Sequence, residues 1–334
     1  MAESGVKSAK AQFVVKYNNS DDTDSLTNAT ESGTYTDNAN GSADTISFTL
    51  NNQKNKWMHG YFPGSNDYLK VWIKTQSWYG KGNDKLYCGK FVIDQISLTG
   101  GADSASKMEL EGIATPVKAS FSVTQKNKKW KKSTLETIAT KIAKSAGLKV
   151  VYHADKISTD EMTQSGTDME FLFSTAKKYG VGMKIFAKKI LLYDIRRYEK
   201  KKAKVTIKKS QVEEYDFQNK IMARYNAVQL KNDDIEYSFK IPNTKGNRKL
   251  FLTDAANSIK NAEKIAKAAL RESRRENYKV TLVITGSTKI YSTMNIKLEG
   301  FGKENGKYFV DKAEHSIDGA YTTTIEAHKV VTNF

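Results

Sequence analysis

The sequence contains little cysteine and no long apolar run. Cys88 is the single cysteine, which excludes an internal disulfide and fits a protein folded in a reducing compartment. We expect its side chain to be buried in a strand. No stretch approaches the roughly 20 apolar residues that a membrane-spanning helix needs, and the N-terminus lacks the apolar region of a signal peptide. We therefore expect no membrane span and no secretion signal.

Residues typical of catalytic or metal sites are few and scattered. The four histidines are His59, His153, His315 and His328, and none is spaced from another as metal ligands on a helix would be. We expect His315 and His328 to face each other in a C-terminal hairpin. Motifs for phosphate, dinucleotide or serine-hydrolase chemistry are absent.

Two groups of acidic residues, at 213–216 and 233–236, could in principle form an acid pair for glycoside cleavage. Adjacent residues of a strand point to opposite faces, so each group would need a partner from elsewhere. The sequence therefore predicts no catalytic, cofactor-binding or metal-binding residues and a protein that is not an enzyme. A cell-wall hydrolase is a further alternative, but the sequence offers no credible acid pair for it.

Positive charge is what the sequence has in excess, with 54 Lys and Arg against 37 Asp and Glu, a net charge of +17. Such a balance favours acidic partners such as nucleic acid or acidic protein surfaces. Three basic clusters, at 126–132, 196–204 and 271–279, each contain or adjoin an aromatic residue. The candidate contact residues in them are Lys128, Lys129, Trp130, Lys131, Arg196, Arg197, Lys200, Lys201, Lys202, Arg271, Arg274 and Arg275. The simpler interpretation is a solvated face, because no nucleic-acid recognition motif accompanies the clusters.

The two ends of the chain both indicate β-structure. In the first part, strands are expected at 11–17, 45–50, 68–79 and 107–113, with a strand pair at 86–100. The polar residues 21–44 are expected to form a long loop. Strands are expected again after residue 201, two of them around a turn at 232–234, together with one amphipathic helix at 257–276. Short strands separated by turns are typical of antiparallel barrels and sandwiches.

A stretch of a different kind, residues 130–194, lies between these parts. Ser133 or Thr134 can cap a first helix that Gly147 ends in a left-handed conformation. A short strand follows at 148–152, and a second helix, capped from within 165–168, runs to Gly180. Residues 181–194 are expected to form a hairpin that turns at 187–189.

We therefore expect an α+β fold that is mainly β. Two tube-like antiparallel β-barrel domains, residues 1–115 and 201–334, would flank an inserted module, residues 116–200, of two helices and a hairpin. The similar size of the two β-domains suggests a duplication.

One sequence pattern spans the module. It consists of an isoleucine–alanine pair and a glycine, then a glutamine, a small residue, an aspartate, a phenylalanine–leucine pair, an alanine, and a tyrosine–glycine pair. The matching positions are Ile138, Ala139, Gly147, Gln164, Ser165, Asp168, Phe171, Leu172, Ala176, Tyr179 and Gly180. The pattern resembles the phage late control gene D family of tail baseplate hub proteins. The resemblance covers about 65 residues.

The resemblance implies a homotrimeric hub, related to the hub halves of type VI secretion spikes, in which each chain supplies two tube-like β-domains. The resulting pseudo-hexameric ring would join a sixfold tail tube to a threefold central spike. Implied partners are further copies of the chain, a tail tube or tube-initiator protein, a separate spike protein, baseplate wedge proteins and a tape-measure protein. The implied location is a virion or a phage-tail-like particle, such as a contractile bacteriocin, assembled in the bacterial cytoplasm.

Under this resemblance the motif residues are architectural. Gln164 and Asp168 would cap the second helix, and Phe171 and Leu172 would pack it on the hairpin. Two other functions remain open: a basic nucleic-acid-binding protein, and a peptidoglycan-binding module, because helix 134–148 also resembles LysM repeats. LysM repeats are usually shorter and occur in series, which favours the hub.

Overall fold

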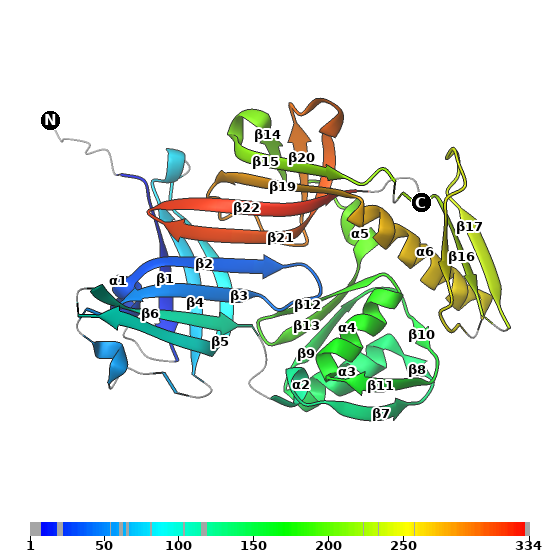
Figure 1. Cartoon of the computed structure of the whole chain (residues 1–334), viewed down its shortest axis with the longest axis horizontal. Helices are drawn as coiled ribbons and strands as arrows, with labels where there is room; N and C mark the ends of the chain where they lie inside the picture. Colours follow the sequence, from blue (N-terminus) through cyan, green and yellow to red (C-terminus); the bar gives the residue numbers. More distant parts are fainter. Residues whose placement is uncertain are drawn as a thin grey trace.

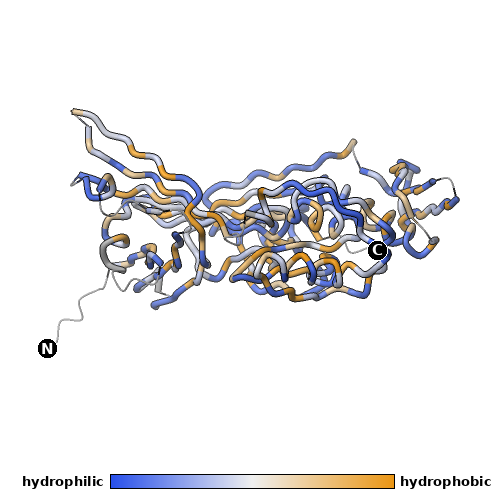
Figure 2. The backbone as a smooth tube through the Cα atoms, turned by 90° about the horizontal axis from the view of Figure 1, so that it is seen from below, coloured by the Kyte–Doolittle hydropathy of each residue, from blue (hydrophilic) through white to orange (hydrophobic). Residues whose placement is uncertain are grey.

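The computed structural model describes residues 8–330 except 19–22, 54, 60–62, 65–66, 81, 103, 115–118, 223, 233 and 257. As expected, the fold is α+β and mainly β, and its largest element is a 12-stranded sheet (Figure 1). Figure 2 shows the same elongated body coloured by hydropathy, with hydrophobic and hydrophilic residues alternating along the extended chain.

The N-terminal strands pair antiparallel in the order β1, β4, β5, β6, β3, β2. Their bounds are β1 Lys10–Tyr17, β2 Thr30–Asn38, β3 Thr45–Asn51, β4 Tyr68–Gln76, β5 Asp84–Gly101 and β6 Ser104–Ile113. The strand pair expected at 86–100 is instead the single long strand β5. Its first half pairs with β4 as far as Val92 and its second half pairs with β6 from Val92 onward. The sheet therefore folds over at Val92 and encloses a core that includes Cys88, whose predicted burial is confirmed.

The prediction of a long loop at 21–44 is wrong. Residues Thr23–Ala29 form helix α1, and Thr30–Asn38 form β2, which pairs with β3 on one side and β21 on the other. β2 carries few apolar residues: Gly33, Tyr35 and Asp37 point inward while small polar residues point outward. Buried and less buried residues alternate along β2 as in other strands. Because few of them are apolar, a hydrophobicity pattern does not predict the strand.

The central module has the predicted core of two helices and a hairpin. Its elements are α2 Ala119–Ser122, β7 Lys126–Trp130, β8 Ser133–Thr134, α3 Leu135–Ala146, β9 Lys149–His153, β10 Ser158–Thr159, β11 Met162–Gly166, α4 Asp168–Lys178, β12 Val181–Phe186, β13 Lys189–Asp194 and α5 Ile195–Lys200. Thr134 caps α3, and Gly147 ends it at φ 73°. The two-residue hairpin turn has positive φ at Ala187 and Lys188, which suits the twist of the strands.

The C-terminal part returns to β-structure. Its elements are β14 Val205–Lys208, β15 Val212–Asn219, β16 Ala227–Lys231, β17 Glu236–Lys240, β18 Lys249–Leu252, α6 Ile259–Glu276, β19 Tyr278–Thr285, β20 Asn295–Glu299, β21 Gly306–Asp318 and β22 Ala320–Lys329. α6 is the helix expected at 257–276, and it packs on the small sheet β17-β16-β18. Residue 257, residue 233 of the expected turn and the expected boundary at 115–116 lie outside the described residues.

The two β-rich parts share one sheet because β2 pairs with β21 (Figure 1). The path continues from β21 through β22 and β19 to β15. Within the described part of the chain, no strand pairing closes either β-rich part into a separate barrel. The sheet is therefore open, with a strand edge at each end.

Candidate functional site

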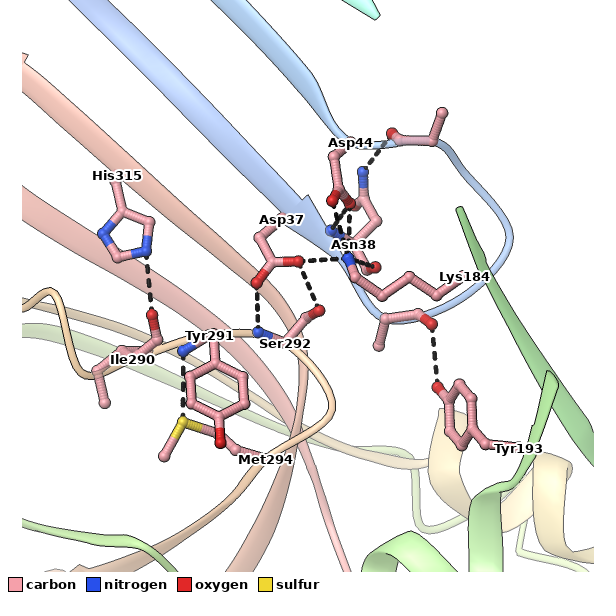
Figure 3. A network of polar contacts seen from close by, with 12 residues as sticks. Asp37, Asn38, Asp44, Lys184, Tyr193, Ile290, Tyr291, Ser292, Met294 and His315 are labelled. Carbon is pink, nitrogen blue, oxygen red and sulfur yellow. Dashed lines mark hydrogen bonds and ion pairs between the residues drawn. The ribbon is translucent and has the colours of Figure 1, made fainter. Parts of the chain in front are cut away.

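A buried cluster around Lys184 holds the module against the large sheet (Figure 3). Lys184 Nζ in β12 donates to Asp44 Oδ1 and Oδ2, at 2.8 and 2.9 Å, and to the Asn38 carbonyl oxygen at 2.7 Å. It also pairs with Asp37, whose carboxylate accepts from the backbone N and the hydroxyl of Ser292, both at 2.7 Å. One lysine thus connects the module, the β2–β3 connection and the β19–β20 connection.

This cluster holds two carboxylates and one ammonium group. Burial alone would raise the pKa of Asp37, but Lys184 and Ser292 outweigh it and the pKa is lowered. Burial raises the pKa of Asp44 to about 7, although Lys184 opposes the change. Burial would lower the pKa of Lys184, yet the two carboxylates raise it. Lys184 therefore stays charged and is the group on which the cluster depends.

A second buried cluster joins α5, α6 and the β21–β22 hairpin. Arg275 Nε lies 2.6 Å from Glu199 Oε1, and His328 Nε2 lies 2.9 Å from the same oxygen. His328 Nδ1 lies 2.8 Å from Asp311 Oδ2. Burial would lower the pKa of His328, but Asp311 and Glu199 raise it to about 9. Burial would raise the pKa of Glu199, but His328 and Arg275 lower it to about 2.

The prediction that His315 and His328 face each other is wrong. In the β21–β22 register His315 lies opposite Thr323, and His328 lies opposite Phe309. His315 is buried, with Nδ1 2.9 Å from the Tyr321 hydroxyl, and burial lowers its pKa to about 4. Among the described residues, no three His, Cys, Asp or Glu side chains are grouped so as to hold a metal ion.

The motif residues pack together as the module core, but the prediction that Gln164 and Asp168 cap the second helix is wrong. The side chains of Ile138, Ala139, Phe171, Leu172, Ala176 and Tyr179 are buried in one cluster with the β12–β13 hairpin. Thr167 caps α4 through a reciprocal pair of hydrogen bonds with Glu170, which confirms the cap expected within residues 165–168.

Gln164 has a different role. Its side chain is fully buried, accepts a hydrogen bond from Trp130 Nε1 at 2.9 Å and donates one to Asp168 Oδ1 at 2.9 Å. Asp168 also pairs with Lys126. Gln164 and Asp168 therefore tie β7 and β11 to the first turn of α4. The partners Lys126 and Trp130 lie in a strand that the sequence pattern did not reveal.

The three predicted basic clusters lie on β7, on and after α5, and on α6. Two of their residues are not surface contacts, contrary to the prediction: Trp130 and Arg275 are 7% and 6% exposed. Lys128 Nζ lies 4.0 Å from the centre of the Trp130 ring, and Arg197 pairs with Asp155. The exposed candidates are Lys128, Lys129, Lys131, Arg196, Arg197, Lys200, Lys201 and Lys202, while Arg271 and Arg274 are half-buried.

The outer face of the large sheet is rich in hydroxyl groups. Ser47, Thr34, Ser316, Thr322 and Thr285 are successive cross-strand neighbours on β3, β2, β21, β22 and β19. Thr34 Oγ1 lies 3.4 Å from Ser316 Oγ. Charged residues on this face are Glu109, Glu111, Glu214, Asp216, Glu314, Asp318, Glu326, Lys107, Lys279 and Lys312. This hydroxyl face is therefore mainly acidic, on a chain of net charge +17.

Besides the outer sides of β1 and β14, two further edges of the sheet have no strand partner among the described residues. One is the second half of β5, residues 94–101, beyond the end of β4; the other is the outer side of β15. Apolar side chains line both edges: Ile96 and Leu98 on β5, and on β15 Phe217 and Tyr215, which is 50% exposed. Open edges are templates for pairing with another chain.

The edge of β1 is protected. Thr27 of α1 accepts a hydrogen bond from the backbone N of Val15 at 3.1 Å. α1 therefore covers part of the strand that begins the sheet, and β5 and β15 remain the open ends of the run of strands from β5 to β15. Of the helices that the structure describes, none has the length and apolar character needed to cross a membrane.

No protein-family model matches the sequence, and no curated protein sequence matches it. Solved structures do match. The 43 kDa tail protein of prophage MuSo2 from Shewanella oneidensis has a TM-score of 0.73 at 14% identity, covering 96% of this chain and 98% of that one. The tail protein from Neisseria meningitidis MC58 has a TM-score of 0.71 at 13% identity, covering 96% of each chain.

An E. coli component of the type VI secretion system, described as similar to the bacteriophage T4 tail proteins gp27 and gp5, has a TM-score of 0.56 at 10% identity. The match covers 97% of this chain and 78% of that one. At these identities the likeness shows a shared fold. The chain therefore has the fold of phage tail proteins, over almost its whole length.

Proposed function

We propose that the chain is a structural hub protein of a phage tail or phage-tail-like particle, of the late control gene D kind that its module resembles. The observation that carries the proposal is the run of antiparallel strands β5, β6, β3, β2, β21, β22, β19 and β15, which is open at both ends. The shared fold with phage tail proteins supports it.

The strand count favours a closed ring. Because the run has eight strands and every neighbour is antiparallel, β15 of one copy can pair with β5 of the next without breaking the alternation. Three copies of eight strands give a ring of 24. Each copy supplies four strands from each β-rich part, so a threefold ring has a sixfold-like wall.

This arrangement suits a joint between a sixfold tail tube and a threefold spike. The proposed division is two tube-like domains, residues 1–115 and 201–334, around the module at 116–200. The proposed partners are two further copies, a tail tube or tube-initiator protein, a spike protein, wedge proteins and a tape-measure protein. The role is structural, and the proposed location is a baseplate.

The side chains at the two edges support the pairing. Tyr215 and Phe217 lie on the core side of β15, and Ile96 and Leu98 lie on the core side of β5. Joining the edges would bring these apolar groups together and continue the hydroxyl face around the ring. That face would then line the axial channel, where hydroxyl and acidic groups offer DNA little to bind.

Light scattering on the purified chain tests the ring. The expected mass is about 112 kDa, three times 37.5 kDa, and it should persist at high salt because the joined edges are apolar. Replacing Tyr215 and Ile96 with Glu should give a folded monomer. Met58→Glu is the matched control, at a side chain that is 53% exposed elsewhere. A wild-type monomer at every concentration would contradict the proposal.

A further inference from the structure

One face of the N-terminal part carries lysines in an ordered array. It is formed by β1, β4 and the first half of β5, on the side away from the core. Lys16, Lys70 and Lys90 are cross-strand neighbours and form one row. Gln12, Lys74 and Lys85 are also cross-strand neighbours and form a second row, parallel to the first. We call these residues, with Lys10, the lysine face.

Apolar residues separate the two lysine rows. Val14, Trp72 and Tyr87 are cross-strand neighbours between them. The Trp72 and Tyr87 rings lie 5.3 Å apart, and Tyr87 lies 6.2 Å from Phe186 at the tip of the module hairpin. Two adjoining grooves, of about 570 and 610 Å³, run along the face and share Gln12, Lys74 and Lys85.

Part of the positive charge of the lysine face has no ion-pair partner among the described residues. In the part of the structure that is described, Lys16, Lys74 and Lys90 take part in no ion pair. Asp84 borders the face, but its carboxylate accepts hydrogen bonds from Thr288 and from the Lys85 backbone. Crowding is evident at Lys90, because burial and then the nearby Lys188 and Lys70 lower its pKa.

We propose that the lysine face docks an acidic protein surface with an apolar strip at its centre. An apolar centre with a charged rim is the usual anatomy of a protein interface, with Trp and Tyr as anchors. A nucleic acid fits less well. Base stacking needs a free ring face, yet Lys85 Nζ lies 4.8 Å from the centre of the Trp72 ring and Tyr87 packs beside it. The face also has no arginine to grip phosphate in a bidentate manner.

The lysine face is independent of the proposed ring closure. The core of Phe13, Val71, Phe48 and Leu110 lies between it and the hydroxyl face, so the two surfaces look in opposite directions. In a ring whose channel is lined by the hydroxyl face, the lysine face would lie on the outside. Its occupant would therefore bind whether or not three copies assemble.

Fluorescence anisotropy of labelled probes tests the proposal. The probes are a synthetic peptide of alternating glutamate and leucine and a single-stranded oligo(dT) of equal length. The variant is the triple charge reversal Lys70→Glu, Lys74→Glu and Lys85→Glu, with the charge-neutral triple change to Gln as a second version if the first fails to fold. The control reverses three exposed lysines of the module with the same charge change: Lys141→Glu, Lys149→Glu and Lys156→Glu.

The wild type should bind the peptide more tightly than the oligonucleotide. Peptide affinity should fall at least about tenfold in the face variant and remain unchanged in the control. Trp72→Ala should weaken the peptide several-fold and leave oligo(dT) unchanged. Equal loss in the face and control variants would overturn the proposal, because it would show attraction by net charge alone. Tighter binding of oligo(dT), lost in the face variant, would also overturn it and would assign the surface to nucleic acid.

Discussion

Lys184 Nζ lies 2.8 Å from Asp44 Oδ1, although the two residues are 140 positions apart in the chain. The pair joins the module hairpin to the connection between β2 and β3, and Asp37 and Ser292 extend it to the C-terminal part. Tyr193 adds a hydrogen bond from its hydroxyl to the Ala39 carbonyl oxygen at 3.0 Å (Figure 3). The position of the module on the sheet therefore depends on buried polar contacts.

Lys184→Met should strongly destabilise the protein. The substitution keeps an unbranched side chain of similar shape but leaves Asp37 and Asp44 buried without a cation, which costs about 3–5 kcal/mol of unfolding free energy. Urea denaturation measures the change. Lys189→Met, at an exposed position of β13, is the control and should change stability by less than about 0.5 kcal/mol. Equal stability of the two variants would contradict the role given to Lys184.

Gln164→Leu tests the contact between β11 and α4. Leucine removes the buried amide, so Trp130 Nε1 loses its acceptor and Asp168 Oδ1 loses a donor, and a loss of about 2–3 kcal/mol is expected. The cap variant Thr167→Ala should cost only about 1 kcal/mol. If the cap variant proved the more damaging by thermal unfolding, the bridging role of Gln164 would be wrong.

Elements with a strong hydrophobic period were predictable from the sequence. Leu135, Ile138 and Ile142 mark α3, and the glycine at 147 marks its end. Strand β2 was missed because its outward residues are Thr and Ser and its inward ones include Gly33 and Asp37. A Cβ on Gly33 would come within 2.5 Å of the Phe48 ring, so this position is selected by a contact that only the folded chain reveals.

The candidate surfaces were less accessible to sequence reasoning. A run of basic residues along the chain predicts a basic cluster, but Lys16, Lys70 and Lys90 come together only through strand register. Arg275 has the sequence context of a surface arginine, yet it is buried against Glu199, which is 76 positions away. Strand pairing decides both outcomes, and local patterns do not encode it.

The two histidines of the β21–β22 hairpin should titrate at opposite extremes. The pKa of His328 is raised to about 9 by Asp311 and Glu199, against burial, whereas burial lowers the pKa of His315 to about 4. NMR of the imidazole protons should therefore show His328 charged and His315 neutral at pH 7. A common titration midpoint near 6.5 would contradict both environments.

The free energy of unfolding should fall as the pH rises through the raised pKa of His328. The folded state binds the His328 proton more tightly than the unfolded state, so this contribution is full below pH 6.5 and is lost as the pH rises through about 9. Relative to His328→Gln, the wild type should lose up to about 1.4 kcal/mol per pH unit in that window. Urea denaturation of both proteins across this window measures the difference, and a difference that is independent of pH would refute it.

Cross-linking of the two open edges tests the ring most directly. Ser97→Cys on β5 and Asp216→Cys on β15 place one thiol at each end of the eight-strand run, too far apart to join within one chain. A short bismaleimide should convert the double variant into covalent dimers and trimers, with about 112 kDa, three times 37.5 kDa, as the largest product. Each single variant should stay a monomer on a denaturing gel. A double variant that remains monomeric, or that forms products beyond the trimer, would contradict a closed threefold ring.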